Sequence, residues 1–136
     1  MSSQDNVELV KKFFHHFLND EIDALLDLQS DDVVWEIGQG PAVDVVPYFG
    51  VFKGREGCLD CLTKYDGAAD PQVFEMEEYF GDKDKVFVLG HEQVTAKPTG
   101  KSFESKLIFI FTVRDGKIAA MNGNFDTAAL KQAFSS

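Results

Sequence analysis

Two apolar runs around a short glycine-containing link constrain this chain more than any other feature. Residues 107–113 are apolar apart from Thr112, and a second run begins at Ile118. Arg114-Asp115-Gly116 stands between them, and two β-rich runs around such a link predict a β-hairpin. A three-residue link would form a type I turn with Gly116 in the left-handed conformation, which creates a bulge.

This turn predicts a register in which Val113 lies opposite Lys117, and it divides the hairpin into two faces. A two-residue link would shift the pairing by one residue and mix the two sets, because side chains alternate with a period of two. The predicted pairs also place Phe109 opposite Met121 and Leu107 opposite Gly123. One face carries Leu107, Phe109, Phe111, Met121, Gly123 and Phe125, and the other carries Ile108, Ile110, Ala120, Asn122 and Asn124.

Length and composition narrow the class of protein. A chain of 136 residues, of which 13 are phenylalanine, predicts a single domain over 1–136 with an aromatic core or apolar pocket. The net charge of −10 argues against nucleic acid and against an anionic membrane as partners. The N-terminal residues do not resemble a signal peptide, and no apolar run approaches the ~20 residues of a membrane span, so the expected location is cytoplasmic.

Neither the cysteines nor the histidines form a metal or redox motif, so no metal and no cofactor is expected. Cys58 and Cys61 have the C-x-x-C spacing, but the thioredoxin-like context and a second zinc-binding pair are both missing. We interpret them as small helix residues. His15 and His16 lack a partner at i+4, so we expect them at the solvent boundary of a helix.

The remaining elements follow from apolar periodicity and turn residues. Asp5 and Glu8 predict a capping box for a first helix, and Asp20 is expected to cap a second, short helix over 21–28. A Gly- and Pro-rich aromatic loop should follow a strand at 33–37. The other expected elements are a helix over 55–65, strands over 73–80, 85–96, 102–113 and up to Asp126, and a helix over 127–134 capped by Asp126 or Thr127. This order predicts an α+β fold, a cone-shaped curved antiparallel sheet wrapped around N-terminal helices with an apolar pocket.

Five segments in this order resemble the SnoaL-like branch of the nuclear transport factor 2-like (ketosteroid isomerase-like) superfamily. They span nearly the whole chain, and the ordered set is more specific than any one segment. The resemblance implies the cone-shaped fold, whereas function varies widely on this fold. The segments are ALLDLQSDDVVWE (24–36), PYFGVFKGREG (47–57), GDKDKVFVLG (81–90), FTVRDGKI (111–118) and FDTAAL (125–130).

Cyclases and epoxide hydrolases of this superfamily place polar groups on the last two strands, including a carboxylate on the final one. By motif, that carboxylate falls at Gly123, and the polar positions of the preceding strand fall at Leu107 and Phe109. This sequence therefore departs from the family pattern at the acid itself.

One carboxylate remains as a catalytic candidate, at Glu92. If Thr99-Gly100 makes a two-residue turn, Glu92 lies opposite Leu107 on the pocket face, where the resemblance to epoxide hydrolases also implies an acid. Burial there would raise its pKa and suit it to acid or base chemistry. The alternatives are an outward-facing Glu92, or one paired with Lys106. A loop longer or shorter by one residue would instead place His91, the second catalytic candidate, in the pocket.

The predicted ligand-binding residues are mostly apolar, with two that carry a polar group. The resemblance places Trp35 in the pocket wall, and Tyr48 could offer its hydroxyl to a ligand. Asn122 and Asn124 are expected on the opposite face, and Asp126 as a helix cap rather than a catalyst. The full predicted set is Trp35, Tyr48, Phe49, Leu107, Phe109, Met121 and Phe125.

Two functional hypotheses remain open. The first is a small cyclase, isomerase or hydrolase that acts on an apolar cyclic or polyketide-like compound by general acid/base chemistry. The second is a non-catalytic module that binds an apolar small molecule, favoured by the glycine at 123. In both, a homodimer is expected, because Ile108 and Ile110 would otherwise leave an apolar face exposed. The competing monomeric account has the C-terminal helix cover that face.

Overall fold

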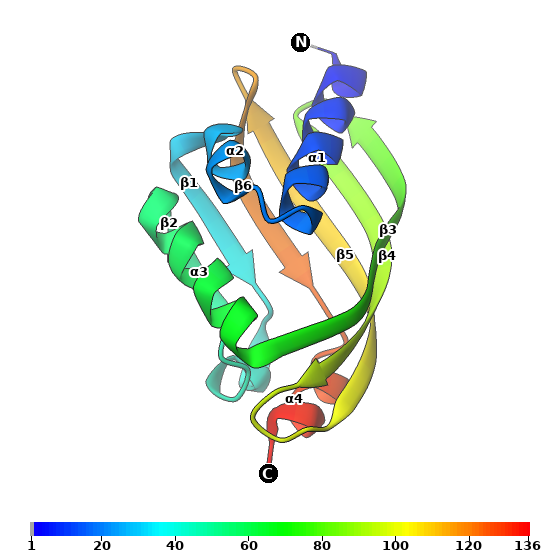
Figure 1. The fold of residues 1–136 in the computed structure, drawn as a ribbon. Helices are drawn as coiled ribbons and strands as arrows, with labels where there is room; N and C mark the ends of the chain where they lie inside the picture. The colour runs from blue at the N-terminus through cyan, green and yellow to red at the C-terminus, as the bar shows by residue number, and fades with distance from the viewer. Residues whose placement is uncertain (1) are drawn as a thin grey trace.

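A computed structural model describes residues 2–136, which form a mixed α+β fold (Figure 1). Three α-helices and one 3-10 helix lie before the third strand, and a last α-helix closes the chain. The helices are α1 (Ser3–Leu18), α2 (Ile22–Asp27), the 3-10 helix η1 (Gly40–Asp44), α3 (Gly54–Ala68) and α4 (Thr127–Phe134). The strands are β1 (Gln29–Ile37), β2 (Gly50–Lys53), β3 (Ala69–Asp82), β4 (Lys85–Ala96), β5 (Ser102–Arg114) and β6 (Lys117–Asn124).

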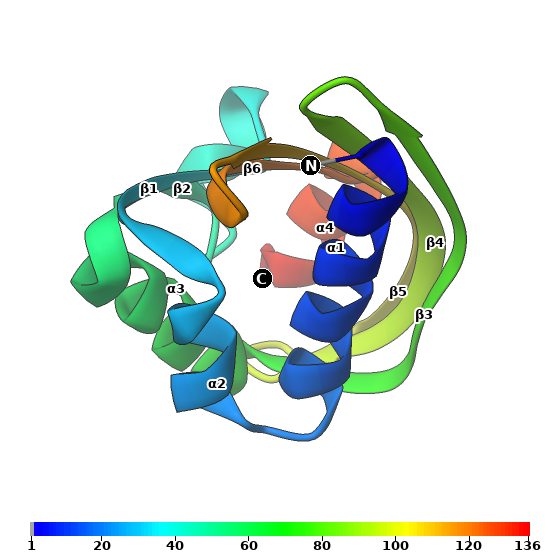
Figure 2. The same cartoon turned by 90° about the horizontal axis from the view of Figure 1, so that it is seen from above.

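All six strands belong to one sheet with the order β2-β1-β6-β5-β4-β3. The strands from β3 to β6 form an antiparallel meander, as predicted, whereas β1 pairs in parallel with β6. The sheet curves around α1, so that α1 lies inside its concave face (Figure 2). The expected cone is confirmed.

Aromatic side chains of α1 hold it against the concave face. The ring of Phe13 packs edge-on against Trp35 and Phe111, with ring centroids 5.9 and 5.2 Å apart. Phe14 packs against Phe109 and Phe111 at 5.4 and 5.6 Å. Such ring pairs add to the burial of apolar area, so α1 and the inner residues of β1 and β5 form one core.

The β5–β6 hairpin has the predicted faces but not the predicted turn. Arg114 pairs with Lys117, so the link is the two-residue turn Asp115-Gly116, with φ of 51° and 75°. These positive φ values at both central residues match a type I′ turn, which asparagine or aspartate followed by glycine favours. The predicted three-residue link is therefore wrong.

A bulge preserves the faces in spite of the shorter link. Val113 pairs with Ile118 but Thr112 pairs with Ala120, which leaves Ala119 as an extra residue. Beyond the bulge Phe109 lies opposite Gly123 rather than Met121, a shift of two residues. A shift of two leaves each side chain on its original face, and Phe109 and Met121 both point to the concave side, as expected.

The β4–β5 link contains four residues instead of the predicted two, so the register again shifts by two residues. Ala96 donates its N–H to the carbonyl of Lys101, so residues 97–100 form the loop, and Glu92 lies opposite Ser105 rather than Leu107. The inward orientation of Glu92 does not change.

Three local expectations are corrected. Ser2, not the Asp5–Glu8 pair, caps α1, in a capping box that Ser2 forms with Asp5. Asp20 does not cap α2; it adopts a φ of 56° and turns the chain between the two helices. The aromatic loop contains η1 and β2, and β2 pairs with β1 at the edge of the sheet.

Helix α4 closes one end of the cone (Figure 1) and does not cover the convex face of the sheet. Phe134 packs against Tyr48 and against Phe103, an inward-facing residue of β5. The side chain of Asp126 accepts a hydrogen bond from the N–H of Ala129 at 3.1 Å, which confirms the predicted cap. Within residues 2–136, every helix is too short or too polar to serve as a membrane span.

Candidate ligand pocket

A cavity of about 60 Å³ lies between the concave face of the sheet and helices α1 and α3. Its wall is almost entirely apolar and aromatic. It contains Phe13, Phe14, Phe17, Trp35, Ile37, Tyr48, Cys61, Leu62, Tyr65, Phe74, Glu92, Phe109, Met121 and Phe125. An apolar enclosure with a few converging polar groups is the usual form of a small-molecule site.

Glu92 is the one acidic residue in this wall. It is 1% exposed, and neither carboxylate oxygen has a hydrogen-bond partner among the described residues. The alternatives of an outward side chain and of a pair with Lys106 are therefore wrong. Burial raises the pKa of Glu92 to about 8. The carboxyl group is consequently mostly protonated at neutral pH and can donate a hydrogen bond.

Two tyrosine hydroxyls share this environment. The hydroxyls of Tyr48 and Tyr65 are buried without a partner among residues 2–136, and their rings lie 4.9 Å apart, edge to face. Burial and, secondarily, the nearby Glu92 carboxyl raise the pKa of both tyrosines well above the usual value. Both hydroxyls thus remain protonated donors.

Tyr65 was not among the residues predicted from sequence. It lies in the last turns of α3, whereas Tyr48 lies in the aromatic loop before β2. Phe17 and Leu62, also outside the prediction, complete the same side of the wall. The spacing of apolar and aromatic residues in α1 and α3 predicts that these three side chains are buried. It does not distinguish buried residues that face a cavity from those that pack in the core.

The indole of Trp35 lines the cavity as expected, but its polar atom is engaged. Its Nε1 donates to the side-chain oxygen of Gln29 at 2.7 Å, and both residues are buried. Trp35 therefore contributes a surface to the cavity rather than a free donor.

The other predicted lining residues divide into two groups. Phe109, Met121 and Phe125 line the cavity. Phe49 and Leu107 are buried but lie outside the wall, so their predicted positions are corrected. The ring of Phe49 packs against Phe125, with ring centroids 5.0 Å apart, and edge to face against Tyr48, at 5.6 Å.

Gly123 stands at the position where the superfamily that the sequence resembles carries an acid. A Cβ at this position would lie 3.2 Å from the ring of Phe109 and 3.4 Å from Phe125 and Ile37. The space toward which an acidic side chain would point is thus occupied by apolar groups. A carboxylate at 123 would require these side chains to move.

His91 lies on the opposite, convex face and does not line the cavity, which corrects its placement as a catalytic candidate inside the pocket. Its Nδ1 is 2.9 Å from a carboxylate oxygen of Glu77. That hydrogen bond raises the pKa of the exposed His91 above its usual value. Asn122 and Asn124 share this face, as expected, and Asn124 donates to the Asn122 side chain at 2.7 Å.

The cysteines are core residues of α3, as interpreted from sequence, although Cys61 also reaches the cavity wall. Both are free, and burial raises the pKa of Cys58 to about 11 and that of Cys61 to about 12. The thiols are therefore protonated and poor nucleophiles at neutral pH.

The chain belongs to the SnoaL-like domain family, whose model matches residues 10–121. A nuclear transport factor 2-like protein from Burkholderia xenovorans is 29% identical, with 99% of each chain covered and a TM-score of 0.89. Another, from Burkholderia pseudomallei, is 19% identical over the whole of both chains, with a TM-score of 0.85. TerC, co-crystallised with polyporic acid, is 24% identical, with 97% of this chain and 99% of TerC covered and a TM-score of 0.81. No curated protein sequence matches this chain.

Glu92→Gln tests the burial of an unpaired carboxyl through the pH dependence of stability. Between the ordinary pKa of 4.5 and the folded value of about 8, the folded state retains a proton that the unfolded state releases. The free energy of unfolding of the wild type therefore falls as pH rises through this window, whereas glutamine does not titrate. We expect the variant to gain roughly 4 kcal/mol relative to the wild type from pH 4.5 to pH 8, measured by urea denaturation.

Glu36→Gln is the matched control, because Glu36 is an exposed carboxylate of β1 that faces away from the cavity. It should retain the pH dependence of the wild type. Parallel stability curves for Glu92→Gln and the wild type would contradict the assignment of Glu92 to an apolar, unpaired environment.

Proposed function

We propose that the protein binds an apolar small molecule that presents a hydrogen-bond acceptor, such as a carbonyl oxygen, to Glu92, Tyr48 and Tyr65. The observation that carries this proposal is the set of three buried polar side chains in one apolar cavity that have no hydrogen-bond partner within residues 2–136. Buried polar groups in folded proteins are nearly always paired, so an unpaired set that converges on a cavity favours an absent ligand as the partner.

The same groups support acid/base chemistry on such a ligand. The ionised fraction of Glu92 would take a proton from a carbon beside the ligand's carbonyl group, while the tyrosine hydroxyls stabilise the negative charge on the oxygen. The carboxyl group formed in this way would return the proton to another carbon of the ligand. This describes a cyclase- or isomerase-type reaction on an apolar cyclic or polyketide-like compound, in which Glu92 is the acid or base. The alternative is a non-catalytic binding module, and Gly123 favours it because a second carboxylate is missing from that position.

A ligand of this class requires the cavity to open. Sites for drug-sized ligands occupy about 300–1,000 Å³, and an engineered cavity of about 150 Å³ accepts benzene. A groove of about 340 Å³ lies on the surface next to the cavity and shares four wall residues with it, namely Phe17, Leu62, Tyr65 and Phe74. Rotation of these partly buried side chains would join the two spaces. We therefore place ligand entry between α1, α3 and β3.

Tyrosine-to-phenylalanine variants test the binding proposal, with polyporic acid, the compound co-crystallised with TerC, as the first probe of a panel of carbonyl-bearing apolar compounds. We expect saturable binding in calorimetry, and about tenfold weaker binding in Tyr48→Phe and in Tyr65→Phe, because each loses one hydrogen bond. The ligand-free variants should be more stable than the wild type, because each loses a buried, unpaired hydroxyl.

Tyr79→Phe is the control, because Tyr79 is a half-buried tyrosine of β3 outside the cavity wall. Its affinity should equal that of the wild type. Failure of the whole panel to bind, or equal losses in Tyr48→Phe and Tyr79→Phe, would contradict the proposal. Where a bound compound is converted, Glu92→Gln should abolish turnover and retain binding; binding without turnover in the wild type would identify the non-catalytic alternative.

We also propose that the protein is a homodimer that associates through the convex face of the sheet. Phe80, Phe87 and Ile108 are 52%, 37% and 44% exposed. Phe80 pairs with Phe87 across β3 and β4, and Phe87 pairs with Ile110 across β4 and β5, so they form a continuous apolar stripe. Helix α4 packs elsewhere and leaves this stripe uncovered, which favours a two-fold contact with a second copy.

Charge substitutions in the stripe should separate the subunits. Sedimentation at micromolar concentration is expected to give twice the 15.2 kDa chain mass for the wild type. Phe87→Lys and Ile108→Lys should give folded monomers, whereas Val51→Lys, at an exposed position of the opposite edge strand β2, should remain dimeric. A wild-type monomer that does not change on concentration would refute the dimer.

A further inference from the structure

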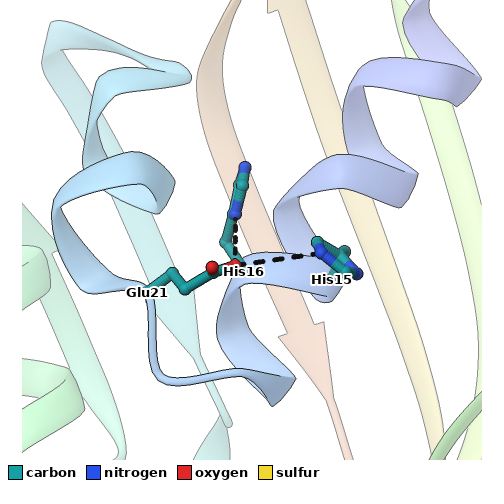
Figure 3. Close-up of side chains that lie close together, drawn as sticks. All are labelled: His15, His16 and Glu21. Carbon is teal, nitrogen blue, oxygen red and sulfur yellow. Dashed lines mark hydrogen bonds and ion pairs between the residues drawn. The ribbon is translucent and has the colours of Figure 1, made fainter.

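Two histidines and a glutamate outside the cavity, residue types that can ligate metals, converge at the link between α1 and α2. The Nδ1 atom of His16 lies 2.9 Å from Oε1 of Glu21, and the Nε2 atom of His15 lies 3.8 Å from the same oxygen. All three ligand atoms fall within 4.8 Å of one another. Figure 3 shows both imidazole rings beside the Glu21 carboxylate, although the two histidines are adjacent in sequence.

The backbone of this link holds the three positions in place. The N–H of Glu21 donates to the carbonyl of His16 at 2.9 Å, and Asn19 donates its backbone and side-chain N–H groups to the carbonyl of His15. Asp20, with a φ of 56°, reverses the chain between the helices. The carboxylate of Glu21 is therefore returned over the last turn of α1, outside the i+4 position that a pair of ligands on one helix would use.

We propose that His15, His16 and Glu21 form a binding site for a divalent transition-metal ion of the zinc type. Zinc bonds of about 2.0–2.1 Å in a tetrahedral arrangement place ligand atoms about 3.3 Å apart, and the distances of 2.9 and 3.8 Å lie on either side of this value. The side chains of His15, His16 and Glu21 are 67%, 23% and 50% exposed. Because they are exposed, they are free to rotate toward an ion, and a fourth position on the ion stays open to water.

The donor set determines the class of metal. Two imidazole nitrogens and one carboxylate oxygen suit zinc, copper(II) or nickel(II), whereas calcium and magnesium require mostly oxygen ligands. The net charge of −10 of the chain also favours a cation over an anion at its surface. A bound ion would join the end of α1 to the start of α2, beside the groove through which we place ligand entry, because Phe17, Asp20 and Ile22 line that groove.

A metal ion at Nε2 of His15 would determine which ring nitrogen of this histidine carries the proton. A metal at Nε2 leaves the proton on Nδ1, and the side-chain nitrogen of Asn19 lies 3.4 Å from that atom. For the Asn19 side-chain oxygen to accept from Nδ1, the amide must turn and give up its bond to the His15 carbonyl, which the backbone N–H of Asn19 retains. Metal-bound histidines commonly make such a bond to a carbonyl or carboxylate oxygen.

Zinc titration of the full-length protein by calorimetry tests the site. We expect saturable binding of one zinc ion per chain at pH 7.5, not displaced by excess calcium or magnesium. His15→Asn, His16→Asn and Glu21→Gln should each weaken binding by at least about tenfold. The control is His91→Asn, because His91 is also a surface histidine beside two carboxylates, Glu75 and Glu77, but forms no such three-residue group. It should retain wild-type affinity.

Imidazole nitrogen chemical shifts distinguish this geometry from adventitious binding to an acidic surface. Zinc should shift Nε2 of His15 and Nδ1 of His16 and leave both ring nitrogens of His91 unchanged. Zinc binding that is absent, that survives all three ligand substitutions, or that shifts His91 alone would overturn the proposal. Circular dichroism checks that the variants at these surface positions remain folded.

Discussion

The packing of α1 into the concave face of the sheet is the contact on which the rest of the structure depends. Phe13 and Phe14 meet inward residues of β1 and β5, so the helix fixes the two sides of the curved sheet relative to each other. The enclosure that results is lined by aromatic side chains and is screened from water. Its low polarity determines the chemistry of every polar group that points into it.

Glu92 shows this dependence most clearly. The alternation of β4 points it inward, and within residues 2–136 its carboxylate oxygens receive no hydrogen bond that would stabilise the charged form. A group in this position lowers the stability of the ligand-free protein, as do the unpaired hydroxyls of Tyr48 and Tyr65. Groups that reduce stability and share one cavity are typical of functional sites, where a ligand offsets the loss.

Sequence reasoning identified the faces of the strands better than their partners. Both predicted links around β5 were wrong in length, yet Phe109, Met121 and Glu92 kept their faces. The longer β4–β5 link shifts the register by two residues, and the shorter β5–β6 link together with the bulge at Ala119 does the same. Features that depend on contacts between distant segments could not be predicted from the sequence. Strand β2 is defined by pairing with β1, and Tyr65 reaches the cavity only because α3 packs over it. His15 and His16 acquire Glu21 through a chain reversal that a helical pattern does not describe.

An apolar cavity holds Glu92 in its neutral form at physiological pH, and the proposed function depends on this state. The most direct measurement is a titration of the Glu92 side-chain carboxyl carbon by carbon-13 NMR in the ligand-free protein, assigned by comparison with Glu92→Gln. The structure predicts a midpoint near pH 8 for this one signal. A midpoint near the ordinary glutamate value of 4.5 would show that the carboxyl is solvated or paired, and it would contradict both the site and the function proposed for it.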